Sequence, residues 1–463
     1  MLSLSFDALQ SAYASGAVSP EEVVSEVYER INAAGNDGVW ISRAKREDAA
    51  ASARTLQSLR PEERARLPLY GLPFAVKDCI DVAGTPTTCA CPDFAYLPQR
   101  SASAVERLIA AGAIYIGKTN MDQFATGLVG TRSPYGVARN PFNADYIPGG
   151  SSSGSAVAVA AGLVSFALGT DTGGSGRVPA SYTNTVGLKP TVGKISPRGL
   201  VNACRSIDCI SIYTLTGAEA LQVLSVAQGY EPETPFSRPP DQTSDASEAL
   251  DRRDFFFGVP DDKFLDFFGD TDTPVLFQQA VAAMELLGGR ARRIDYAPML
   301  EVNQMMFFGP LLAERFAAVG TFVRDNPSSC DPTVGHLIER AVDIFSVETW
   351  RMLYRLEEIK RSLVPMWHEL DVLLTPTVGR LWTKADIDAD PVGPNFKNGY
   401  YTNFVNPLDL CAVATPNGFA RSGVPVGVCL VGQAHSEHFL CGLADRFSAL
   451  RVPHAGAREM AQG

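Results

Sequence analysis

Two clusters of glycine and serine carry the side chains best suited to chemistry in this sequence. The first cluster spans residues 149–155 and reads GGSSSGS, and the second spans residues 169–180 and reads GTDTGGSGRVPA. The apolar segment 156–168 separates them. A flexible linker would not be interrupted by an apolar segment and then recur with an aspartate and an arginine. The pattern therefore favours two turns that return beside each other, with a buried helix between them.

Such a pair of turns suits acyl transfer, which needs an oxygen nucleophile and a set of donors for the developing oxyanion. Both clusters supply serine hydroxyls. Because glycine permits unusual φ/ψ angles, the second cluster could aim consecutive backbone N–H groups into one concavity. The residues concerned are Thr172, Gly173, Gly174 and Ser175.

A serine nucleophile needs a base at pH 7. The chain has only five histidines, and the first is His336, so we consider a lysine instead. Lys77 follows the apolar stretch 72–76, which predicts a strand that ends on a desolvated ammonium group. Burial lowers the pKa of a lysine from about 10.4 and can leave neutral amine available. Alternatively, Lys77 is a strand-end lysine that reaches the surface with Asp78 as its partner.

Other patterns point to different chemistry or to none. A phosphate-binding loop would need G-K-[ST] after the first cluster, and none follows. Residues 150–154 match the G-x-S-x-G nucleophile elbow centred on Ser152, but residues 146–150 (YIPGG) are a poor strand to lead into it. This interpretation and a plain flexible loop both stay open. Ser42 and Lys45 match S-x-x-K without a K-T-G companion, which indicates a coincidence on an exposed helix.

The composition excludes several classes of protein. With 463 residues, of which 46% are hydrophobic and 20% charged, the chain can bury a large core and is not disordered. A net charge of -11 gives no broad positive field for nucleic acid or anionic lipid. An anionic substrate would therefore have to be held by a few local Arg or Lys residues. The longest apolar run, 156–168, is too short to cross a bilayer.

The N-terminus and the cysteines indicate the compartment. No basic segment of a secretory signal precedes the first apolar residues. The nine cysteines are odd in number and spread along the chain, which is typical of reduced, mostly buried thiols. Because no Cys or His spacing fits a zinc site, we expect no metal and no cofactor. These features predict a cytoplasmic protein with no nucleic-acid partner and no membrane partner.

Helical and strand patterns alternate along the chain, which predicts an α/β fold with a layered sheet. About the first 65 residues are expected to be helical, with helices at 20–34 and 48–60. We expect further helices at 103–111 and within 273–371, and strands at 69–78, 113–116, 255–260, 371–376 and 423–432. Residues 231–253 are rich in Pro, Ser and charge and form the best linker candidate. Because strands from both sides of this segment could join one sheet, we expect one large domain over 1–455 and a tail at 456–463.

Lys77, the two Gly/Ser clusters and residues 187–191 (GLKPT) together resemble the amidase signature family. The resemblance covers about residues 20–450 and includes segments 117–124 and 423–428. It implies an amide hydrolase with a single large α/β/α sandwich around a central mixed β-sheet. The three-layer architecture agrees with the alternation of helices and strands.

The resemblance also assigns roles to individual residues. It implies that Ser175 is the nucleophile, that Ser151 is a bridging serine in a cis peptide, and that Lys77 is the base. Lys77 would take a proton from Ser151, which takes one from Ser175 as Ser175 attacks the amide carbonyl. The oxyanion would be held by the amides of Thr172, Gly173, Gly174 and Ser175, before ammonia leaves and water hydrolyses the acyl-enzyme. Three residues match supporting positions of the family, although loop caps and a buried ion pair would explain them equally well: Ser152, Asp171 and Arg177.

Within this family, the chain is similar to the amidase domain of allophanate hydrolases. The similarity rests on residues 122–132, the third serine of the first cluster, Gly176 and residues 401–406. It implies a small carboxylated amide as substrate. The C-terminal domain of those enzymes is expected to be absent, which would leave this chain the deamidation step alone.

The same similarity implies three substrate-binding residues, Gly127, Phe307 and Arg315. Phe307 stands where the family has a tyrosine. Losing that hydroxyl would remove one hydrogen bond to the substrate carboxylate, worth on the order of 1–3 kcal/mol. The substrate is therefore expected to be allophanate or a related small amide.

Two other functions fit the same family, namely a general small-amide amidase and an amidotransferase-type protein that supplies ammonia to a partner. A catalytically silent scaffold fits less well, because it has no physical need for Lys77, Ser151 and Ser175 together. The aromatic-rich segments 300–325 and 340–370 are expected to be mostly core. Relatives often pair through such surfaces, so a homodimer is a further hypothesis.

Overall fold

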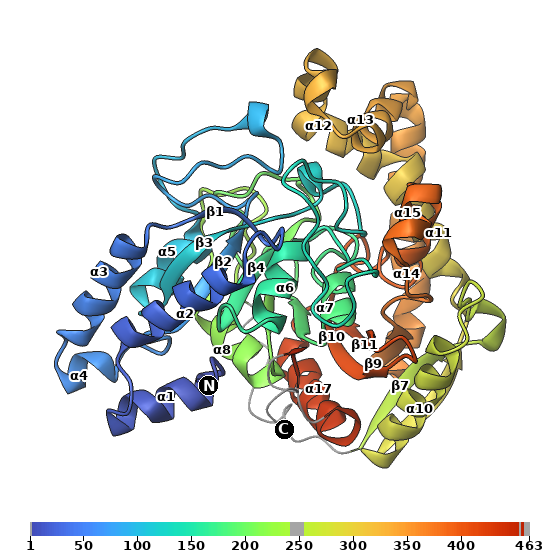
Figure 1. The fold of residues 1–463 in the computed structure, drawn as a ribbon. Coiled ribbons are helices and arrows are strands. Elements are labelled where there is room, and N and C mark those ends of the chain that lie inside the picture. Colours follow the sequence, from blue (N-terminus) through green and yellow to red (C-terminus); the bar gives the residue numbers. More distant parts are fainter. Residues whose placement is uncertain (1, 241–253, 453–454, 458–463) are drawn as a thin grey trace.

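The computed structural model describes residues 2–240, 254–452 and 455–457. Within them, one eleven-stranded sheet has the order β1-β3-β2-β4-β6-β5-β10-β11-β9-β7-β8 (Figure 1). The strands are β1 (Trp40–Arg43), β2 (Pro73–Lys77), β3 (Ile114–Thr119), β4 (Phe166–Asp171), β5 (Val186–Lys189), β6 (Cys209–Thr214), β7 (Phe255–Pro260), β8 (Gly289–Ile294), β9 (Val372–Pro376), β10 (Leu410–Phe419) and β11 (Pro425–Gln433).

Helices cover both faces of this sheet, as the sandwich prediction requires. They are α1 (Phe6–Ser15), α2 (Pro20–Ala34), α3 (Arg46–Gln57), α4 (Pro61–Arg64), α5 (Ser103–Ala110), α6 (Ser153–Ala160), α7 (Val178–Thr183), α8 (Gly217–Ala227), α10 (Thr273–Leu286), α11 (Ala297–Phe308), α12 (Pro310–Asp325), α13 (Pro332–Glu339), α14 (Ser346–Glu369), α15 (Lys384–Ala389), α16 (Gly393–Asn398) and α17 (Glu437–Arg451). Strand β11 separates two layers, because successive side chains of a strand point to opposite faces. Gly427 lies against Ser181 of α7, whereas Gly432 lies against Leu440 of α17.

The sheet is mixed. Strand β2 pairs in parallel with β3 and β4, and β7 pairs in parallel with β8 and β9. The remaining pairings are antiparallel. The fold prediction of an α/β/α sandwich with a central mixed sheet is therefore confirmed.

The parallel pairing of β2 with β4 brings the predicted chemistry together. Both strands are fully buried, and they end at Lys77 and Asp171 respectively. Because parallel neighbours end at the same edge of a sheet, the base candidate and the second Gly/Ser cluster lie at one edge. Helix α6 carries the first cluster at its N-terminal end and contacts both strands.

Most of the predicted elements are confirmed. Helix α2 begins after a capping box, in which Ser19 Oγ accepts from the N–H of Glu22 and the Glu22 carboxylate accepts from the N–H of Ser19. Helices α3 and α5 and strands β2, β3, β7, β9 and β11 lie close to their expected ranges. The buried helix predicted between the two clusters is α6, and strand β4 follows it.

Two segments expected to be helical contain edge strands. Strand β1 (Trp40–Arg43) interrupts the N-terminal helices and pairs with β3, so Ser42 of the S-x-x-K match lies on a strand and not on a helix. Strand β8 (Gly289–Ile294) interrupts the region 273–371 and pairs with β7. Its arginines hide the strand pattern in the sequence. In the fold, Arg290 and Arg292 stack over the ring of Phe256 on β7.

The linker prediction is tested for residues 231–240 alone, because 241–253 lie outside the described residues, as does most of the tail at 456–463. Hydrogen bonds and an ion pair hold residues 231–240 to the rest of the fold. Glu231 accepts hydrogen bonds from Ser103 Oγ at 3.0 Å and from Arg198 Nε at 3.1 Å. Arg238 forms an ion pair with Asp409 at 2.6 Å. Residues 231–240 are therefore attached to the fold at several points.

The second aromatic-rich segment, 340–370, differs from its prediction as core at its N-terminal part. Phe345 is 72% exposed, Trp350 58% and Tyr354 63%. These residues lie at the N-terminal end of α14, where the helix projects away from the sheet (Figure 1). The nearby stretch Ala297–Asp325 is long and apolar enough to span a membrane by composition, but half of its apolar window is buried within the fold. Gly309 divides it into α11 and α12.

Candidate active site

Lys77 ends strand β2 with no exposed surface. Its Nζ donates to Ser151 Oγ at 2.7 Å and to Thr170 Oγ1 at 2.6 Å. Asp78 instead accepts from Thr88 Oγ1 at 2.6 Å and lies 3.7 Å from Lys118 Nζ. The alternative in which Lys77 reaches the surface beside Asp78 is therefore wrong.

Burial lowers the pKa of Lys77 below its ordinary value, because desolvation penalises the charged ammonium. Neighbouring acidic groups, among them Asp122, Asp208 and Asp171, oppose this shift without cancelling it. A neutral Lys77 amine can accept a proton from a hydroxyl at hydrogen-bond distance. Ser151 is placed for that transfer.

Ser151 lies in the loop that leads into α6, and the Gly150–Ser151 peptide bond is cis, as the resemblance implied. Asp122 anchors this loop. The N–H of Asp122 donates to the Ser151 carbonyl at 3.1 Å, and the Asp122 carboxylate accepts from Gly130 N at 3.0 Å. A Cβ at Gly150 would overlap Asp122 Oδ2, so this position requires glycine.

Ser152 makes a structural contact between the first cluster and β4. Its Oγ donates to the Thr170 carbonyl at 3.1 Å and accepts from the Thr170 N–H at 3.2 Å. The nucleophile-elbow alternative needs a strand that leads into this serine, but the preceding residues form a loop. The loop-cap explanation of Ser152 is the one that fits.

The second cluster is folded around Asp171. The Asp171 carboxylate accepts from Arg177 Nε and Nη2, each at 2.9 Å, and from the N–H groups of Gly174 and Gly176, also at 2.9 Å. Burial alone would raise the pKa of Asp171, but the guanidinium of Arg177 outweighs it and holds this pKa below its usual range. The ion pair therefore fixes the shape of the loop between β4 and α7.

One of the four predicted oxyanion donors has an acceptor within the protein. The N–H of Gly174 donates to Asp171 Oδ1 at 2.9 Å. The N–H groups of Thr172, Gly173 and Ser175 have no acceptor within the described part of the chain. Gly174 has φ 137, and a Cβ there would overlap Thr402 Oγ1. Glycine at this position lets the chain turn its N–H inward.

Ser175 occupies the apex of the loop. Its carbonyl oxygen accepts from Tyr213 OH at 2.7 Å, which fixes the backbone, while its side chain lines the pocket. Within the described residues, Ser175 Oγ has no hydrogen-bond partner. The structure thus joins Lys77 to Ser151 directly but does not join Ser151 to Ser175 by a hydrogen bond.

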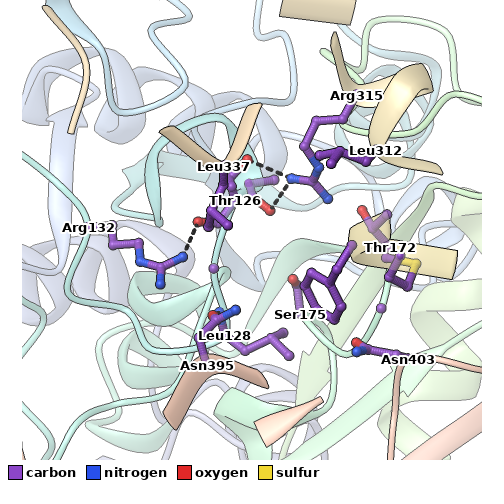
Figure 2. Close-up of a pocket in the computed structure, with 15 residues that line it drawn as sticks. Thr126, Leu128, Arg132, Thr172, Ser175, Leu312, Arg315, Leu337, Asn395 and Asn403 are labelled. Atoms are coloured by element: carbon purple, nitrogen blue, oxygen red, sulfur yellow. Dashed lines mark hydrogen bonds between the residues drawn. The ribbon is translucent and has the colours of Figure 1, made fainter. Parts of the chain in front are cut away.

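The pocket beside Ser175 is small, with a volume of about 50 Å³. The three predicted substrate-binding residues line it, namely Gly127, Phe307 and Arg315. Figure 2 shows Arg315 at one end, held by hydrogen bonds from Nη1 to Thr126 Oγ1 at 2.6 Å and to the Ala125 carbonyl at 3.2 Å.

The Phe307 ring packs against Phe396 with a centroid separation of 4.1 Å and has no polar atom to offer. Arg132, which also lines the pocket, donates to the Thr126 carbonyl from the side opposite Arg315 (Figure 2). Two guanidinium groups therefore give the pocket a local positive charge in a chain of net negative charge.

Several residues of this site were not singled out from the sequence. Thr170 is the second partner of Lys77, and Asp208 accepts from Thr172 Oγ1 at 2.6 Å. Burial raises the pKa of Asp208 to about 6. Thr170 lies in the second cluster but was not marked there as a partner of Lys77, and Asp208 belongs to no recognisable pattern. Arg132 and Asn403 lie in segments 122–132 and 401–406, which carried the resemblance. Their place in those segments was the signal that could have identified them as residues of the site.

Comparison with known proteins agrees with this geometry. The chain matches the Amidase family over residues 22–441. Urea amidolyase of Saccharomyces cerevisiae is 42% identical over 419 residues, which is 90% of this chain but 22% of that protein. The solved structure of Kluyveromyces lactis allophanate hydrolase gives a TM-score of 0.90 at 39% identity, covering 97% of this chain and 73% of that one. A component of the glutamyl-tRNA(Gln) amidotransferase of Acidobacterium capsulatum is 31% identical over 96% of both chains.

The ion pair between Asp171 and Arg177 predicts a large loss of stability on substitution. Asp171→Asn leaves the Arg177 guanidinium buried without its counter-charge, and breaking such a pair costs about 3–5 kcal/mol. The free energy of unfolding, measured by urea titration, should fall by this amount. As a matched control, Glu21→Gln breaks an ion pair with Arg54 whose side chains are 45% and 55% exposed, and it should leave stability close to wild type. A similar small effect for both variants would contradict a loop fixed by the buried pair.

Proposed function

Because the chain belongs to the amidase family and is an amide-hydrolysing enzyme, we propose that it releases ammonia from allophanate or a related small carboxylated amide. The observation that carries the proposal is the 2.7 Å hydrogen bond between Lys77 Nζ and Ser151 Oγ, buried beside the pocket that Ser175 lines. The pocket is small and contains two arginines. The chain covers 22% of the length of the yeast urea amidolyase. The proposal therefore concerns amide hydrolysis alone and not the activity of that whole protein.

In the proposed reaction, Ser175 Oγ attacks the carbonyl carbon of the amide. As it attacks, its proton passes to Ser151 Oγ, and the proton of Ser151 passes to the neutral amine of Lys77. Ser175 lines the pocket, and its Oγ has no hydrogen-bond partner among the described residues. The relay requires this hydroxyl to donate to Ser151 Oγ when substrate is bound. Burial lowers the pKa of Lys77, which favours the neutral amine that accepts the proton.

The oxyanion of the tetrahedral intermediate is held by the N–H groups of Thr172, Gly173 and Ser175. These donors are fixed before substrate arrives, because Asp171 and Arg177 set the loop. Preorganised donors stabilise the developing charge without a reorganisation cost. The contribution of Gly174 is conformational, since its own N–H serves Asp171.

Collapse of the intermediate breaks the bond between the carbonyl carbon and the leaving nitrogen. The relayed proton returns through Ser151 to that nitrogen, and ammonia leaves. The acyl group remains on Ser175 as an ester. Water then attacks this ester with the same relay acting as base, which regenerates Ser175 and releases the carboxyl product.

Arg315 supplies the charge that the net acidic chain lacks elsewhere. Its guanidinium lines the same pocket as Ser175, and Thr126 and the Ala125 carbonyl hold it in place. A planar guanidinium suits a carboxylate, which it can bind through two parallel hydrogen bonds. We assign Arg315 to the substrate carboxylate, with Gly127 and the Phe307 ring forming the adjacent walls.

The similarity to an amidotransferase component over 96% of both chains favours a second candidate, a protein that supplies ammonia to a partner. That candidate differs in its substrate, because it would take glutamine, which is longer than allophanate. The small pocket favours the first candidate. A general small-amide amidase would need no charge recognition and leaves the two arginines unexplained.

We also propose a cytoplasmic protein that acts on a small molecule and forms a homodimer. The net charge of -11 supports the absence of nucleic-acid and membrane partners. The exposed aromatic side chains of Phe345, Trp350 and Tyr354 support pairing between copies of the chain.

Ammonia release tests the function and the nucleophile together. Purified protein should release ammonia from allophanate and malonamate faster than from glutamine or propionamide. Ser175→Ala should abolish turnover, because no other hydroxyl occupies its position. Ser165→Ala is a matched control, since it removes a buried hydroxyl that has no partner among the described residues and lies at the opposite end of β4. Turnover of the Ser175→Ala protein at the wild-type rate, or activity on glutamine alone, would contradict the proposal.

Phe307→Tyr tests the carboxylate end of the pocket. The added hydroxyl offers a hydrogen bond beside Arg315, worth on the order of 1–3 kcal/mol, so the KM for malonamate should fall by about five-fold or more. The KM for propionamide, which has no carboxylate, should stay unchanged. Equal effects on both substrates, or none on malonamate, would remove Phe307 from the carboxylate site.

A further inference from the structure

Asn403 lies beside Ser175 in a segment that none of the proposed chemical steps uses. It follows α16, is 2% exposed and lines the same pocket as Ser175 (Figure 2). The preceding residue, Thr402, donates from Oγ1 to the Gly173 carbonyl at 2.8 Å. Asn403 is therefore placed against the loop whose N–H groups face the pocket.

The side-chain amide of Asn403 has a defined direction. A Cβ built at Gly173 would come within 2.8 Å of Asn403 Oδ1, whereas one built at Gly399 would overlap Asn403 Nδ2. The carbonyl end of the amide thus faces the loop at Gly173, and the amino end faces away from it. What Asn403 presents on the side of the loop is a hydrogen-bond acceptor.

This acceptor is unused within the described part of the chain, where neither end of the Asn403 amide has a hydrogen-bond partner. Buried amides in folded proteins are normally hydrogen-bonded, and an unmet one that lines a pocket points to a ligand. Two other side-chain acceptors of the pocket are occupied. Asn395 Oδ1 accepts from Leu128 N at 2.7 Å, and Thr126 Oγ1 accepts from Arg315.

A bound substrate amide can supply the missing donor. The substrate carbonyl oxygen accepts hydrogen bonds from the N–H groups of the loop, and the substrate carboxylate accepts them from Arg315. Both ends of the substrate therefore act as acceptors. The scissile nitrogen carries N–H groups that need an acceptor, and the arginines of the pocket can only donate. Asn403 Oδ1 faces the loop at Gly173, two residues before Ser175.

We propose that Asn403 is a specificity-determining residue that accepts an N–H of the scissile carboxamide and orients the amide for attack by Ser175. The inference rests on the proposed function, since it takes the scissile bond to lie at Ser175. It extends that function by naming the residue that selects the substrate class. The selected class is an unsubstituted carboxamide in place of an ester. A site built to bind an N–H discriminates against an analogue that lacks it.

The test compares an amide and an ester of the same acyl group, malonamate and monomethyl malonate. Asn403→Leu keeps the size of the side chain and removes the acceptor. The kcat/KM for malonamate should fall by at least about ten-fold, as expected for one hydrogen bond in the transition state. The kcat/KM for the ester, whose leaving oxygen has no hydrogen to donate, should stay within about three-fold. Ammonia and methanol release give the two rates.

Equal losses on amide and ester would overturn the inference, because they would indicate a residue that merely supports the loop. Unchanged kinetics on both would overturn it as well. Wild-type protein that hydrolyses neither compound would contradict the proposed function itself, so the two failures are distinguishable.

A fold control accompanies the comparison. A fluorophosphonate that reacts with Ser175 should label Asn403→Leu at the wild-type rate, because the reagent offers no N–H to the acceptor. Should the leucine variant not fold, Asn403→Ala removes the same acceptor without an added apolar branch. The same amide-to-ester split is then expected. Its absence in a folded alanine variant would overturn the inference.

Discussion

A lysine side chain buried at the end of a central strand sets the strictest constraint on this molecule. An ammonium group without water must lose its proton or be fully hydrogen-bonded. Lys77 Nζ contacts two hydroxyls, those of Ser151 and Thr170, which is one acceptor fewer than an ammonium group needs. One hydroxyl comes from the loop before α6 and the other from β4, so the constraint on one side chain fixes how two distant parts of the chain meet.

Two buried carboxylates hold those parts in place by accepting backbone N–H groups. Asp122 anchors the loop that carries Ser151, and Asp171 with Arg177 folds the loop that carries Ser175. Each loop is thus shaped by a charge that the interior would otherwise not tolerate. This explains why the glycines cluster where they do, since Gly150 and Gly174 approach other atoms too closely for a side chain. Rigid loops in turn supply donors that need no rearrangement during the reaction.

The sequence predicted the parts of this architecture that have a local signature. Apolar strands such as β2, the capped helix α2 and the two Gly/Ser clusters are visible in residue order, and the resemblance supplied the roles of Lys77 and Ser175. Strands β1 and β8 were missed because they lie at the two sheet edges, where polar residues are tolerated, and the sequence of β8 contains three arginines. The direction of the Gly174 N–H and the exposure of Trp350 depend on tertiary contacts, and no local pattern encodes them.

The proposed relay depends on Lys77 reaching its neutral amine form. The pKa of this side chain can be measured directly by carbon NMR of protein labelled at lysine Cε, with Lys77→Met identifying the signal by its loss. We expect the Lys77 signal to titrate below the ordinary lysine value of 10.5, while exposed lysines titrate near that value. A Lys77 signal that remains in its charged form up to 10.5 or beyond would contradict a lysine base whose pKa is lowered by burial.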